Sequence, residues 1–176
     1  MITDFDTYFA QFPALDRERD FEDFWEQSIR SLRDIPIDAN IEQEKKKTKP
    51  GFTGYSVSFK GLNRSRTSGK LLIPEKAQKP RLILVFNDYF SKNQYLNYEL
   101  DHSVGYFFLT LKGHETLNFD QTEEERKTPG YMVDNILDVK SYYVREVFLD
   151  AYRSIDMLRL RNFIDMSSIG IIRKGF

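Results

Sequence analysis

His114 and Glu115 stand next to each other shortly after the apolar run of residues 106–111. A histidine that follows a buried strand, with a carboxylate beside it, is a candidate general base. Asp88 has the same kind of position after the apolar run 82–86, where it could bind a cation or simply form a turn. His114, Glu115 and Asp88 are therefore the residues around which an unusual hydrolytic site could form.

A general base needs a nucleophile, and no serine elbow follows any of the apolar runs. The sequence contains no G-x-S-x-G motif, which would hold a serine on a sharp strand-to-helix turn. Ser167 and Ser168 precede the apolar run 169–172 and so lie on the wrong side of it. Cysteine is absent from the 176 residues, which excludes thiolate catalysis and cysteine-ligated zinc within them.

The remaining motifs point away from metals and cofactors. His102 and His114 are separated by twelve positions, which matches no common zinc spacing. His102 falls at the end of a predicted helix and is interpreted as a surface residue. Neither of the glycine-rich phosphate motifs, G-x-x-x-x-G-K-[ST] and G-x-G-x-x-G, is present. We predict no metal site and no cofactor.

The elements that would position these residues begin with a helix over about 20–34. Its apolar residues recur every three or four positions, as in an amphipathic helix; they are Phe21, Phe24, Trp25, Ile29 and Leu32. Asp20 is the predicted N-cap, and the helix ends before Pro36. Such a helix must pack on another element, because it cannot bury its apolar stripe alone.

An antiparallel hairpin is predicted over about 53–74. Apolar and polar residues alternate from Tyr55 to Lys60, which is typical of a half-buried strand. Residues 61–64, Gly-Leu-Asn-Arg, form the turn, and Thr67–Ile73 forms the second strand. We expect this hairpin to be the edge of the sheet.

Three unbroken apolar runs, at 82–86, 106–111 and 169–172, predict parallel strands covered on both faces. Helices are predicted between them, over 93–101 and about 141–163. This order indicates an α/β fold with a parallel sheet and crossover helices. No repeat or linker interrupts the sequence, so residues 1–176 are predicted to form one domain whose parallel part spans about 80–176.

The second predicted helix has a clear apolar stripe. The residues expected to be buried are Tyr143, Val144, Val147, Phe148, Ala151, Ile155 and Leu158. The residues expected on the opposite, solvated side are Arg145, Glu146, Arg153 and Arg159.

Composition narrows the possible partners. The formal net charge is −1, and the basic run 45–49 follows Glu42 and Glu44, so we expect no nucleic-acid partner. The N-terminus is acidic with no apolar segment behind it, and no stretch is long and apolar enough to span a membrane. We expect a cytoplasmic protein that does not bind membranes.

Several motifs, falling in order, resemble one family. Gly130-Tyr131-Met132 and Asn135–Asp138 match its G-F-M-T-R-G-I-L-D, and residues 142–153 match its Y-Y-Y-R-R-V-Y-x-D-A-x-R. Asp20–Trp25 and Lys70–Pro74 match its lead-in helix and hairpin. From about 20 to 172 the chain is similar to the N-terminal part of the acetyl xylan esterase / cephalosporin C deacetylase family of α/β-hydrolases. The resemblance implies an incomplete α/β-hydrolase sheet, deacetylation as the ancestral reaction, and a small acetylated sugar as ligand.

The chain departs from the family's pattern where the catalytic groups should be. By resemblance, Tyr89 occupies an oxyanion-hole position, but the two glycines that follow it in the family are replaced. Gly175 falls on the position of the nucleophilic serine, and the acid and histidine of the family's triad lie further downstream. We therefore expect a truncated, degenerate esterase-like protein that is inactive alone.

Three alternatives stay open. The chain could be a non-catalytic binding module, or one half of an esterase completed by another chain. In the second case, a complementing chain or a second copy would join the open sheet edge at residues 169–172. The third is an active hydrolase that uses His114, Glu115 and Asp88.

Overall fold

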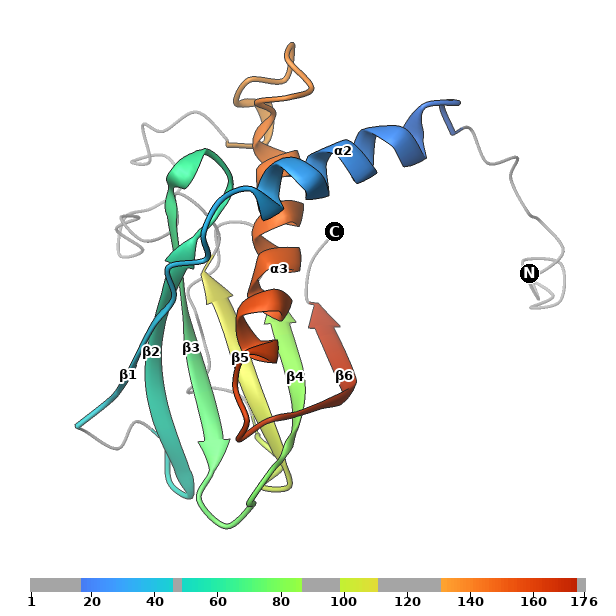
Figure 1. The fold of residues 1–176 in the computed structure, drawn as a ribbon. Coiled ribbons are helices and arrows are strands. Elements are labelled where there is room, and N and C mark those ends of the chain that lie inside the picture. Colours follow the sequence, from blue (N-terminus) through green and yellow to red (C-terminus); the bar gives the residue numbers. More distant parts are fainter. Residues whose placement is uncertain (1–16, 46–48, 87–98, 111–130, 174–176) are drawn as a thin grey trace, which may run out of the picture.

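The computed structural model describes residues 17–45, 49–86, 99–110 and 131–173 (Figure 1). The helices are α2 (Phe21–Arg33) and α3 (Tyr143–Arg159), with single 3-10 turns at η1 (Leu62–Arg64) and η4 (Tyr131–Val133). The strands are β1 (Asn40–Gln43), β2 (Phe52–Lys60), β3 (Arg66–Pro74), β4 (Arg81–Phe86), β5 (Val104–Thr110) and β6 (Asp165–Arg173).

The strands form one mixed sheet in the order β1-β2-β3-β5-β4-β6. The pairs β1–β2, β2–β3 and β3–β5 are antiparallel. Strand β4 pairs in parallel with β5 on one side and with β6 on the other. A hairpin followed by parallel strands, with α3 connecting β5 to β6, confirms the predicted α/β class. The prediction that residues 1–176 form a single domain stays a prediction.

The hairpin is confirmed, with a register that runs from Phe52 beside Pro74 to Lys60 beside Arg66. In its turn Asn63 has a φ of 57°, a left-handed conformation that asparagine adopts more readily than most residues. The hairpin is not the edge of the sheet, however, because β1 pairs with the outer side of β2. Strand β1 could not be predicted, because its four mostly polar residues show no apolar alternation.

Both faces of the central strands are buried. Helix α3 covers one face through Met157 and Leu158, which join a core with residues of four strands: Val57, Phe59, Leu71, Ile73, Leu82, Leu84, Phe107 and Leu109. The opposite face is a second cluster of Phe52, Leu72, Val85, Tyr106 and Phe108. The unbroken apolar runs therefore predicted the burial of β4 and β5 correctly.

Strand β6 is where the prediction of burial on both faces is wrong. It is the last strand of the described sheet, and Ile171 and Ile172 are 64% and 42% exposed. An unbroken apolar run indicates that a strand is suited to burial on both faces. Whether the strand is buried depends on which other elements cover it.

Helix α3 is shorter than the predicted 141–163, and its buried face is rotated from the predicted stripe. Glu146 and Arg153, expected in solvent, are buried, whereas Phe148, expected in the core, is 54% exposed. The reason is that the charged side chains bond to the hairpin, while Phe148 contacts Trp25 edge-on at a centroid distance of 5.8 Å. Apolar periodicity does not register such polar contacts.

Helix α2 lies where it was predicted and packs against α3 (Figure 1). Leu32 is fully buried, but Phe21 is 42% exposed, so only part of the predicted stripe is covered. Asp20 is at the N-cap position, although its side chain makes no capping hydrogen bond. Within the described ranges, neither helix is long and apolar enough to cross a membrane.

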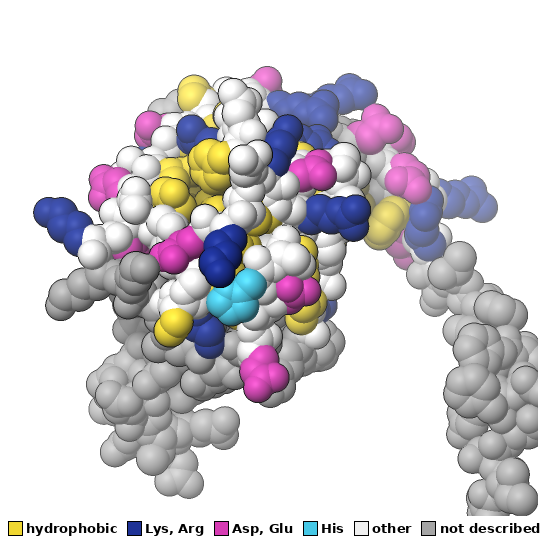
Figure 2. Space-filling model, turned by 90° about the horizontal axis from the view of Figure 1, so that it is seen from below, with side chains coloured by type: hydrophobic (Ala, Val, Ile, Leu, Met, Phe, Trp, Pro, Cys, Tyr) yellow, Lys and Arg dark blue, Asp and Glu magenta, His cyan; other side chains and the backbone are white. Residues whose placement is uncertain are grey.

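The predicted helix 93–101 lies mostly outside the described residues, and its described part, 99–101, is not helical. His102 is therefore in a turn before β5 rather than in a helix, with its ring 4.8 Å from that of Phe52. Figure 2 shows the described surface seen from below, with acidic and basic side chains interspersed.

Candidate functional site

The carboxyl ends of β4, β5 and β6 meet at one edge of the sheet, where the three strands point in the same direction (Figure 1). Phe86, at the end of β4, lies beside Leu109 of β5 and Arg173 of β6. Neighbouring strands are about 5 Å apart, so the three strand ends lie within roughly 10 Å of one another. Ligand and catalytic groups of open α/β sheets gather at this edge.

Each site residue expected from the sequence follows one of these strand ends. Asp88 and Tyr89 follow β4, His114 and Glu115 follow β5, and Gly175 follows β6. All five lie outside the described residues. The structure thus brings together the strands that lead to them, and the roles of the five side chains stay predictions.

A buried polar network lies at the same end of the sheet. Ser68 of β3 pairs with Thr110 of β5, which puts the hairpin turn beside the carboxyl end of β5. Thr67 Oγ1 donates a 2.6 Å hydrogen bond to Asp150 Oδ2, and Asn63 Nδ2 donates one of 2.6 Å to Glu146 Oε1. Helix α3 is thereby fixed to the turn by two carboxylates.

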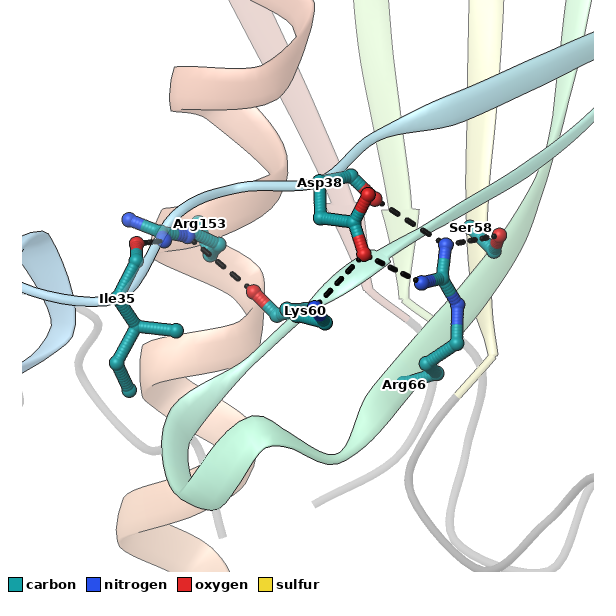
Figure 3. A network of polar contacts seen from close by, with 6 residues as sticks. All are labelled: Ile35, Asp38, Ser58, Lys60, Arg66 and Arg153. Carbon is teal, nitrogen blue, oxygen red and sulfur yellow. Dashed lines mark hydrogen bonds and ion pairs between the residues drawn. The ribbon is translucent and has the colours of Figure 1, made fainter.

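Arg153 extends this network to the segment that follows α2 (Figure 3). Its Nε donates to the Lys60 carbonyl oxygen at 3.3 Å, and its Nη2 donates to the Ile35 carbonyl oxygen. Burial lowers the pKa of Arg153 from its usual value, but an arginine stays charged at neutral pH. One buried cation therefore holds three separate segments together.

A second, exposed network surrounds Asp38 (Figure 3). Its carboxylate accepts hydrogen bonds from Lys60 Nζ at 2.9 Å and Arg66 Nη1 at 3.0 Å. The bond from Lys60, followed by that from Arg66, lowers the pKa of Asp38 below its ordinary 3.8. Arg66 also donates to Ser58 Oγ and to the Asp38 carbonyl oxygen. A carboxylate held by two cations is a poor proton acceptor, so this network is structural.

The described residues thus provide a scaffold for the site. Among them, no group of three or more histidine, aspartate or glutamate side chains could hold a metal ion. The sequence prediction missed the burial of Glu146, Asp150 and Arg153, three residues that bond to the hairpin from one face of α3. Their spacing of four and three positions was the available signal, because it places all three on one side of a helix.

Comparison with known proteins identifies the scaffold. The family model for acetyl xylan esterases (AXE1) matches residues 2–174. The chain belongs to the acetyl xylan esterase family. It is 23% identical to acetyl esterase Axe7A of Xylanibacter ruminicola, a match that covers 83% of the chain. The resemblance drawn from the sequence motifs is therefore confirmed.

Solved structures show the fold of this family. The acetyl xylan esterase from Paenibacillus sp. R4 is 21% identical, with a TM-score of 0.78, and the match covers 97% of the chain. Acetyl xylan esterase 1 from a Thermoanaerobacterium species is 14% identical, with a TM-score of 0.74 and the same 97% coverage. The chain spans 56% and 55% of these two proteins and 35% of the X. ruminicola esterase.

Proposed function

We propose that this chain is a degenerate member of the acetyl xylan esterase family that does not hydrolyse acetyl esters by itself. The observation that carries the proposal is Gly175, which stands where the family resemblance puts the nucleophilic serine. Glycine has no hydroxyl to attack an ester carbonyl, and without the nucleophile the serine-triad mechanism has no first step.

The β4 strand end gives further support. By resemblance, the backbone N–H of Tyr89 would help to stabilise the oxyanion, and two glycines should follow it. Phe90 and Ser91 stand in their place. Side chains at those positions disfavour a loop that needs positive φ, so oxyanion stabilisation would be impaired as well.

The names of the relatives support a proposal for the ancestral reaction class. They are called acetyl xylan esterases and an acetyl esterase, so the substrates that this scaffold once served would be acetylated sugars. The motif resemblance adds cephalosporin-like acetyl esters as the alternative. The described sheet and helix would support the place where the carboxyl ends of β4, β5 and β6 meet.

The test is hydrolysis of a chromogenic acetyl ester, such as 4-nitrophenyl acetate, by the purified 176-residue chain. We expect a rate equal to that of buffer. Turnover that co-purifies with the chain would overturn the proposal. Loss of that turnover in His114→Ala, with retention in the control His102→Ala, would assign the activity to the alternative group of His114, Glu115 and Asp88.

A further inference from the structure

The N-terminal half of α2 forms an aromatic surface together with one residue of α3. The ring of Trp25 contacts those of Phe21 and Phe24 at centroid distances of 6.4 Å and 5.3 Å, and that of Phe148 at 5.8 Å. Phe21 and Phe148 are 42% and 54% exposed, and the other two rings are half-buried. These four residues are called the aromatic face below. Contiguous exposed apolar side chains of this kind mark contact surfaces.

The C-terminal half of α2 is covered, by contrast. Ile29 and Leu32 pack with Leu149 of α3, and Leu32 is fully buried. One apolar stripe on one helix is therefore closed by α3 at its end and open at its beginning. The open part is the part next to the residues that precede α2.

The chain enters α2 from the side of the aromatic face. The N–H of Phe21 donates to the Glu18 carbonyl oxygen at 3.2 Å, which makes a turn directly before the helix. The guanidinium of Arg17 lies over the ring of Phe21, 4.7 Å from its centroid, and forms an ion pair with Glu22. Residue 17 is thus beside the first turn of α2, and the residues before it begin next to the open rings.

The sequence of residues 2–12 has the pattern of an amphipathic helix. Four aromatic residues follow the spacing i, i+3, i+4, i+7, which places them on one side of a helix. They are Phe5, Tyr8, Phe9 and Phe12. Thr3 and Asp6 have the spacing of a capping box at the start, and Pro13 would end the helix. A helix of about ten residues is marginal in water by itself, so it needs a surface to pack on.

We propose that residues 3–12, which lie outside the described residues, form a helix that folds back and packs its aromatic side on the aromatic face. The connection to α2 would be residues 13–20, a usual length for two helices that pack side by side. The family model matches from residue 2, so this segment belongs to the domain that the family shares. The inference goes beyond the proposed function and does not depend on it.

Trp25 provides the test, because it is the only tryptophan in the sequence and lies at the centre of the aromatic face. Acrylamide quenching of its fluorescence measures how far the ring is open to solvent. In the double variant Phe5→Ser with Phe9→Ser, we expect the quenching constant to rise by roughly twofold, because the ring would lose its apolar cover. The matched control, Thr7→Ser with Ala10→Ser, changes the opposite side of the predicted helix and should quench like the unchanged chain.

A reciprocal experiment changes the receiving surface. Hydrogen exchange of the amides of residues 4–12 should be slowed in the unchanged chain and should become faster in Phe148→Ser. Leu160→Ser makes the same kind of change at a residue that is 63% exposed at the other end of α3, and should leave this exchange unchanged. Circular dichroism checks that all variants keep the fold.

Three results would overturn the inference. The first is equal quenching of Trp25 in the two double variants, which would mean that another part of the chain covers the ring. The second is exchange of residues 4–12 that Phe148→Ser does not change. The third is quenching that increases when the unchanged chain is diluted, with dimers seen in sedimentation velocity, because the cover would then be a second copy.

Discussion

The carboxylate of Asp150 on α3 accepts a 2.6 Å hydrogen bond from the hydroxyl of Thr67 on β3, and both side chains are almost completely buried. The two residues lie 83 positions apart in the sequence. A buried carboxylate is stable only with hydrogen-bond donors around it, so this contact fixes where the helix lies along the hairpin.

Removing the Thr67 hydroxyl should destabilise the fold. Thr67→Val keeps the shape of the side chain but takes a donor from a buried carboxylate, and we expect a loss of about 1–3 kcal/mol in the free energy of unfolding. Urea denaturation measures it. Thr67→Ser keeps the hydroxyl and should lose less than half as much. Equal losses in the two variants would mean that the methyl group, rather than the hydrogen bond, matters at this position.

Gly61 is expected to tolerate no side chain, because a Cβ there would lie 2.0 Å from Asp150 Oδ1. Gly61→Ala must displace the buried carboxylate from its bond to Thr67, and we expect it to cost about 1–3 kcal/mol of stability. At the control position, Gly170, the nearest atom would be Ile83 Cγ1 at 3.3 Å. Thermal unfolding should show a clearly smaller effect for Gly170→Ala, and similar effects would argue against the steric explanation.

Arg153→Lys should weaken the link between three segments. A lysine carries one ammonium group and cannot span the carbonyl oxygens of Lys60 and Ile35 as the guanidinium does. We expect a loss of about 1.5–3 kcal/mol, measured by urea denaturation. Arg159→Lys, at an arginine whose side chain is 62% exposed, should change stability by less than about 0.5 kcal/mol. A neutral Arg153→Lys would contradict the bridging role.

Two adjacent residues of α3 test which face of the helix is buried. Leu149 is 1% exposed and contributes to the core between α2 and α3, whereas Phe148 is 54% exposed. We expect Leu149→Ala to cost about 2–5 kcal/mol and Phe148→Ala less than half as much. A larger loss of stability for Phe148→Ala than for Leu149→Ala in thermal unfolding would mean that the buried face of α3 is the one predicted from apolar periodicity.

The acid dependence of stability should include a contribution from Asp38. Because hydrogen bonds from Lys60 and Arg66 lower its pKa in the folded state, its stabilising effect is present above the ordinary value of 3.8. That effect is lost as the pH falls through the lower folded-state pKa. NMR titration of the carboxyl should give a midpoint below 3.8 that rises in Lys60→Met. An unchanged midpoint in that variant would show that the ion pair does not form in solution.

The sequence was sufficient to predict elements whose burial follows a simple pattern. The hairpin and the cores of both helices have apolar residues at regular intervals, β4 and β5 are unbroken apolar runs, and these elements form close to the expected residues. β1 and the buried face of α3 could not be predicted in this way. Residues 40–43 pair through their backbone, and Glu146 and Arg153 are buried because of partners more than eighty positions away.

For the candidate site, the sequence was sufficient to predict the location but not the chemistry. The order of the apolar runs indicated that three strand ends would share one edge, and the register of Phe86 with Leu109 and Arg173 confirms it. The chemistry expected at Asp88, His114 and Gly175 stays a prediction, because these three residues lie outside the described part of the chain.

The bond between Thr67 and Asp150 also sets an order of events during synthesis on the ribosome. The hairpin can form as soon as its own residues have emerged, but Asp150 follows Thr67 by 83 residues. At the usual elongation rates of about 5–20 residues per second, the hairpin waits roughly 4–17 s for the helix that covers it. Over that interval its apolar face is open to other nascent chains, and chaperones would act there first.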